Sequence, residues 1–74
     1  MKYNVVYNAW RDAYDITVEG VDPYCVGEKL AAHFPGQTTT TIDGRVLVYN
    51  NLTASIGMSA IEQAVAKALK ECKQ

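Results

Sequence analysis

The sequence has few of the residues on which most catalytic and metal sites depend. It contains one histidine, His33, and two cysteines, Cys25 and Cys72. A single histidine excludes sites built from two or three imidazoles, and two cysteines are too few for a disulfide framework. The glycines are scattered singly, so there is no phosphate-binding glycine loop, and no serine lies in a nucleophile-elbow motif. We therefore expect no enzymatic activity, no cofactor and no metal.

The two cysteines are far apart in the sequence. Cys25, Lys29 and His33 follow at four-residue intervals on an expected helix. A Cys–His pair for nucleophilic catalysis fails on distance, because eight helical residues span about 12 Å. We predict that Cys25 and Cys72 are free thiols of an intracellular protein; a single bridge between the two helices is the alternative.

Strong net charge and long apolar runs are also lacking. The net charge of −1 argues against nucleic-acid binding through bulk electrostatics, which needs clustered Lys and Arg. No run approaches the roughly 18 apolar residues of a membrane span, and the first residues do not resemble a signal peptide. We expect a cytoplasmic protein that does not enter membranes.

What is present is a chain with the composition of a folded globule. Hydrophobic residues make up 49% of the chain and charged residues 20%, which is wrong for a disordered segment. With 74 residues, the sequence has room for one domain, residues 1–74.

The clearest local signal is a helix over residues 59–73. At 100° per residue, its apolar side chains form one arc that no polar residue interrupts. Ser59 and Glu62 have the spacing of a capping box. The opposite side carries three lysines near the carboxyl end, Lys67, Lys70 and Lys73.

Residues 2–9 and 14–20 are predicted to form a hairpin in which Ala9 lies opposite Tyr14. This register collects the apolar side chains on one face, because directly opposed residues share a face. It places Trp10 at the tip of the loop. The expected apolar face carries Tyr3, Val5, Tyr7, Tyr14, Ile16 and Val18.

A helix is predicted to begin at Asp22-Pro23, with Asp22 as the N-cap and Pro23 as the first helical residue. Pro35-Gly36 is predicted to end it. Gly27 lies inside this helix and lowers its propensity by about 1 kcal/mol relative to alanine, which close approach to the sheet would explain.

Residues 37–50 are predicted to form a second hairpin, because Asp43-Gly44 is the signature of a type I′ turn. We predict that its buried face is the one with the larger volume, which carries Ile42, Leu47 and Tyr49.

The element order ββαββα predicts an α+β two-layer sandwich, with two helices packed on one face of a four-stranded antiparallel sheet. The other sheet face is then open. From the predicted registers we expect this face to support self-association as a homodimer, through Val6, Thr39, Thr41, Val46 and Val48.

Acidic residues gather between positions 12 and 28, where there is no lysine or arginine. Trp10, in the loop of the first hairpin, either folds back over the edge of the core or is exposed as a candidate hot spot for binding. If it is exposed, it and the carboxylates suggest a contact surface for a basic partner protein, formed by Trp10, Asp12, Asp15 and Glu19. The interpretation is a non-enzymatic protein-binding module, such as an inhibitor or regulator of a larger protein machine; anti-defence proteins of phages are one example. The alternative is a nucleic-acid-binding domain that uses the open sheet and the Lys67, Lys70 and Lys73 edge.

Overall fold

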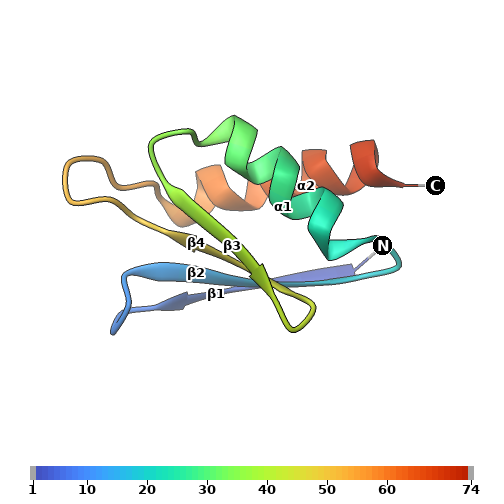
Figure 1. Ribbon diagram of the computed structural model, residues 1–74, viewed down its shortest axis with the longest axis horizontal. Coiled ribbons are helices and arrows are strands. Elements are labelled where there is room, and N and C mark those ends of the chain that lie inside the picture. The colour runs from blue at the N-terminus through green and yellow to red at the C-terminus, as the bar shows by residue number, and fades with distance from the viewer. Residues whose placement is uncertain (1, 74) are drawn as a thin grey trace.

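The computed structural model describes residues 2–73 and has the predicted order ββαββα. The four strands form one antiparallel sheet in the order β1-β2-β4-β3, and both helices cover the same face of it (Figure 1). The expected α+β two-layer fold is therefore confirmed. The elements are β1 (Lys2–Asn8), β2 (Ala13–Glu19), α1 (Pro23–His33), β3 (Thr38–Ile42), β4 (Arg45–Tyr49) and α2 (Met58–Cys72).

The first hairpin has the predicted faces but a register shifted by two residues. Tyr7 lies opposite Tyr14, where the prediction had paired it with Ile16. A shift of two preserves which face each side chain occupies, so the hydrophobic pattern did not distinguish the two registers. The chain turns in residues 9–12, where Asp12 adopts a left-handed φ of 50°, a conformation that aspartate tolerates better than most residues.

The second hairpin has the predicted turn and register, but its buried face is the opposite of the predicted one. Val46 and Val48 are 0% exposed, whereas Ile42 is 48% exposed. The strand order explains this result, because β4 lies beside β2 and Val46 is paired with Ile16. Directly opposed residues share a face, so Val46 joins the helix-covered core that Ile16 occupies.

The first helix begins as predicted. Asp22 accepts a hydrogen bond from the Tyr24 backbone N–H at 3.0 Å, and Pro23 is the first helical residue. A Cβ on Gly27 would collide with the Thr41 hydroxyl of β3. The glycine therefore allows α1 to lie close to the sheet, as the sequence suggested.

The second helix begins without the predicted capping box. Gly57 occupies the N-cap, and no side chain caps the first turn. The Ser59 hydroxyl instead accepts a hydrogen bond from Gln63 Nε2 at 3.3 Å. The predicted apolar arc is buried, with Ile61 and Val65 0% exposed.

A disulfide joins Cys25 of α1 to Cys72 at the end of α2, with the Cα atoms 5.9 Å apart. The prediction of two free thiols was therefore wrong, and the alternative of a single bridge between the helices holds. The two residues are 47 positions apart, so sequence spacing gave no indication that they meet.

Candidate functional site

Among residues 2–73, the most exposed large apolar side chains lie on two loops at one end of the sheet. Trp10 lies in the β1–β2 loop and is 98% exposed, and Leu52 lies in the β4–α2 loop and is fully exposed. Both loops are found at the same end of the molecule (Figure 1). We call this surface the loop end, and define it by residues 9–12 and 50–55.

Hydrogen bonds join the two loops of the loop end. The Asn50 backbone N–H donates to the Asp12 carbonyl oxygen at 2.9 Å, and Asn50 Nδ2 donates to Asp12 Oδ1 at 2.9 Å. Tyr7 also donates its hydroxyl to Asp12 Oδ1 at 2.6 Å. The Asn50 and Tyr7 hydrogen bonds hold the pKa of Asp12 below its ordinary value, and the bond to Asp12 raises the pKa of Tyr7.

The β4–α2 loop is fixed along its whole length. Asn50 Oδ1 accepts from the Ile56 N–H at 3.0 Å, and the Ile56 carbonyl oxygen accepts from the Tyr14 hydroxyl at 2.5 Å. Closer to Leu52, the side chain of Gln37 accepts from the Asn51 N–H and donates to the Ala54 carbonyl oxygen. Trp10 and Leu52 are therefore presented from loops that the rest of the fold holds in place.

The predicted acidic surface is largely occupied by structural contacts. Asp12 accepts the hydrogen bonds that join the two loops of the loop end. Asp22 caps α1, and Asp15 forms an ion pair with Arg45 at 3.2 Å. Glu19 is exposed and lies opposite Lys2 in the sheet register. Of the four predicted contact residues, Trp10 and Glu19 make no side-chain hydrogen bond or ion pair within residues 2–73, and they lie at opposite ends of the first hairpin.

Four of the five predicted self-association residues lie on the helix-covered side of the sheet. Val46 and Val48 are completely buried there, and Thr39 and Thr41 are half-buried beside them. Only Val6, which is 52% exposed, lies on the open face. The prediction that these residues share the open face was therefore wrong for the four residues other than Val6.

The centre of the open sheet face is closely packed, although no helix lies on it. Leu47 is 8% exposed and Ala13 is 1% exposed, although no helix covers them. The Asp15–Arg45 ion pair crosses this face next to Leu47, which is paired with Asp15 in the register. The centre of the open face consequently presents neither a large apolar patch nor an unbalanced charge.

The lysine edge of α2 carries mixed charge. A groove of about 220 Å³ runs between the two helices and combines basic and small side chains with Glu71. The cations of the open face, Lys2 and Arg45, each lie beside a carboxylate. Of the predicted Lys67, Lys70 and Lys73 edge, only Lys67 lines this groove, and nucleic-acid binding by this edge stays a prediction. The groove is lined by Lys29, Ala32, His33, Ala64, Lys67, Ala68 and Glu71.

Sequence reasoning missed Leu52 and Asn50. The available signal for Leu52 was a single large apolar residue between polar neighbours, Asn51 and Thr53, in a segment with no strand or helix pattern. Asn50 gave no signal, because its role depends on Asp12, which is 38 positions away.

Within residues 2–73, no group of three or more His, Cys, Asp and Glu side chains could hold a metal ion, and no helix is long and apolar enough to cross a membrane. Comparison with protein-family models, with curated proteins and with solved structures gives no match.

Proposed function

We propose that this protein is a non-enzymatic binding module that engages another protein through its loop end, as an inhibitor or regulator of that partner. The observation that carries the proposal is the exposure of Trp10, 98%, on a loop that hydrogen bonds hold in place. Tryptophan is enriched among the residues that dominate binding energy at interfaces. A rigid loop also loses little conformational entropy when a partner binds.

Leu52 supports the same proposal from the neighbouring loop. A fully exposed leucine gains free energy only when a partner covers it, since burying such a side chain contributes about 1.5–3 kcal/mol. Two apolar side chains on adjacent fixed loops fit an apolar depression on the partner. The revised surface no longer depends on acidic residues, so we expect its affinity to change little with salt concentration.

The disulfide bears on where this binding takes place. Structural disulfides persist in oxidising compartments and are rare in cytosolic proteins of mesophiles. We infer that the protein works in an oxidising compartment, in place of the cytoplasm that the sequence suggested. Thiol counting by mass spectrometry on protein taken directly from its natural source tests this inference. Two alkylated cysteines would contradict it.

The binding proposal is tested by quantitative capture from a lysate of the source cells, with wild type and single variants. We expect Trp10→Ala and Leu52→Ala to lose the captured protein, with at least about a 30-fold weaker affinity for Trp10→Ala, the loss typical of a hot spot. Tyr24→Ala is the matched control, because Tyr24 is 60% exposed on α1, away from the loop end.

The proposal fails if no protein is captured, or if capture is the same for wild type and Trp10→Ala. Trp10 is the only tryptophan. Once that partner has been purified, the fluorescence emission of Trp10 reports whether the partner covers it, after the emission of the partner's own tryptophans has been subtracted.

A further inference from the structure

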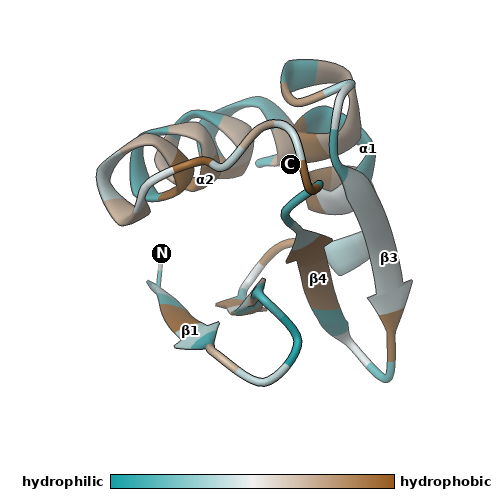
Figure 2. Cartoon of the chain, turned by 90° about the vertical axis from the view of Figure 1, so that its left-hand side faces the viewer, coloured by the Kyte–Doolittle hydropathy of each residue, from teal (hydrophilic) through white to brown (hydrophobic). Residues whose placement is uncertain are grey.

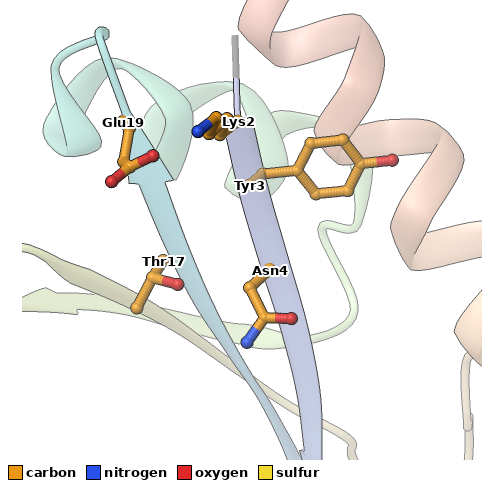
Figure 3. Close-up of a pocket in the computed structure, with 5 residues that line it drawn as sticks. All are labelled: Lys2, Tyr3, Asn4, Thr17 and Glu19. Atoms are coloured by element: carbon orange, nitrogen blue, oxygen red, sulfur yellow. The ribbon is translucent and has the colours of Figure 1, made fainter.

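Strand β1 is an edge strand that the helices leave largely uncovered. Tyr3 and Tyr7 point to the helix side of the sheet, yet they are 39% and 44% exposed. Val6, on the other side, is 52% exposed. Figure 2 shows β1 at the margin of the sheet opposite β3. Figure 3 shows Tyr3 extending toward α2 beside an open pocket of about 350 Å³, so this end of β1 is uncovered as well.

This edge lacks the features by which proteins usually protect edge strands. Proline, bulges, short length and repeated charge discourage an edge strand from pairing with another chain. β1 has seven residues, no proline, and an uninterrupted register with β2. Its single charged residue is Lys2, at the very start. An exposed apolar edge of this kind is a template for another strand.

The other edge of the sheet is different. β3 has five residues, four of which are threonine, and α1 packs against it through Gly27. Its one large exposed apolar residue is Ile42, at the end of the strand. The template for strand pairing is therefore specific to β1.

The residue pattern of β1 is complementary to itself in the antiparallel direction. If Val5 of one chain lies opposite Val5 of another, Tyr3 lies opposite Tyr7 in both directions, and Asn4 lies opposite Val6. Directly opposed residues share a face, so each Tyr3–Tyr7 pair forms an aromatic cross-strand contact on the helix side.

The charges also favour the antiparallel arrangement. With Val5 on the two-fold axis, the two Lys2 residues lie at opposite ends of the joined strands, each opposite Asn8 of the second chain. Glu19 is the register partner of Lys2 within its own chain, so each end carries balanced charge. Parallel pairing would place Lys2 against Lys2, and like charges in that position are destabilising.

We propose that two copies of this protein associate through antiparallel pairing of their β1 strands, which creates one continuous eight-stranded sheet with Val5 on the two-fold axis. The contact is isologous, so it uses up both β1 edges and closes the assembly as a dimer. Stable interfaces bury about 800 Å² per partner, and one seven-residue strand with three exposed large apolar side chains offers less. The dimer therefore dissociates on dilution.

The first test is the solution mass by light scattering over about a thousandfold range of concentration, since a dimer at equilibrium needs roughly that range to change from mostly dimer to mostly monomer. We expect wild type to change from dimer to monomer, and Val6→Lys to be a folded monomer throughout, because it adds the charge that protected edges carry. Ile42→Lys is the matched control: Ile42 is 48% exposed on the opposite edge strand, and its substitution leaves the mass unchanged.

The second test fixes the register. Cα atoms of directly opposed residues are about 4.5–5.5 Å apart, which a disulfide can span. Val5→Cys therefore forms a covalent dimer under mild oxidation. Asn4→Cys does not, because Asn4 lies opposite Val6 of the second copy and the two new thiols are offset. Intact mass spectrometry distinguishes the new bridge from exchange with the native one.

Wild type that stays monomeric at every concentration overturns the proposal and leaves β1 free for a strand of a different protein. A dimer that Val6→Lys leaves intact, or that Ile42→Lys dissolves, overturns it as well. Trp10→Ala changes neither mass nor cross-linking, so these results are independent of the fate of the loop-end proposal.

Discussion

Asn50 holds Asp12 by two hydrogen bonds of equal length, one from its backbone N–H to the Asp12 carbonyl oxygen and one from its side chain to Asp12 Oδ1, both 2.9 Å. The same Asn50 side chain accepts from the Ile56 N–H. One half-buried asparagine thus fixes both loops that present Trp10 and Leu52. The arrangement of the loop end therefore depends on Asn50, which belongs to it and whose side chain is committed to these hydrogen bonds.

We expect Asn50→Ala to lower the free energy of unfolding by about 1–3 kcal/mol, because it leaves polar partners without a hydrogen bond. Chemical denaturation measures this loss. Asn4→Ala is the control, since Asn4 is exposed and surface substitutions of this kind stay within about 0.5 kcal/mol. Trp10 fluorescence anisotropy in the folded state should also fall in Asn50→Ala. An unchanged anisotropy would mean that the loop is held by other contacts.

The stability of the protein should depend on the ionisation of Asp12. Hydrogen bonds from Asn50 and Tyr7 lower its pKa in the folded state. A lowered folded-state pKa gives stability that is present above the unfolded-state pKa of about 4 and is lost as the pH falls through the folded-state pKa. Asp12→Asn does not titrate, so its free energy of unfolding should fall less than that of wild type in this acid range. Parallel acid dependences would contradict the assignment.

The Cys25–Cys72 disulfide should contribute much of the stability. A bridge that joins residues 47 positions apart removes chain entropy from the unfolded state worth about 4 kcal/mol, and a domain of this size has a total stability of about 4–11 kcal/mol. Reduction should therefore shift the denaturation midpoint strongly. The double variant Cys25→Ala/Cys72→Ala should be weakened without reductant and should not respond to it. Wild-type curves that are identical with and without reductant would show that the thiols are free.

Gly27 and Thr41 should be energetically coupled. Gly27→Ala places a Cβ against the Thr41 hydroxyl, and overpacking of this kind typically costs about 1–3 kcal/mol. In a Thr41→Ala background the obstacle is absent, so the same substitution should be neutral or stabilising by up to about 1 kcal/mol through helix propensity. A double-mutant cycle measures the difference. Additive effects would mean that α1 does not approach β3 through this contact.

Local signals in the sequence were sufficient for the elements and their order. The apolar arc of α2, the Asp22-Pro23 start of α1 and the Asp43-Gly44 turn each act within a few residues, so their chemistry is visible in the chain itself. These signals placed the helices and strands to within one or two residues of their observed ends. Together with the size of the chain, they determined the α+β two-layer fold.

The face of β4 that is buried was decided only by the tertiary structure. Residues 46–49 are apolar on both sides of the strand, so periodicity carries no preference. The choice depends on the pairing of β4 with β2, which puts Val46 opposite Ile16 and so on the helix-covered face. Gly27 lets α1 approach that face closely at Thr41.

The proposed binding surface shows the same division between local signals and tertiary structure. The sequence determined that Trp10 lies in the hairpin loop, and it identified a run of carboxylates nearby. Which carboxylates remain available depended on partners distant in the chain: Asn50 binds Asp12, and Arg45 pairs with Asp15. Local chemistry places a residue in a turn or on a face, but hydrogen bonds, ion pairs and the disulfide form between segments that only the packed fold brings together.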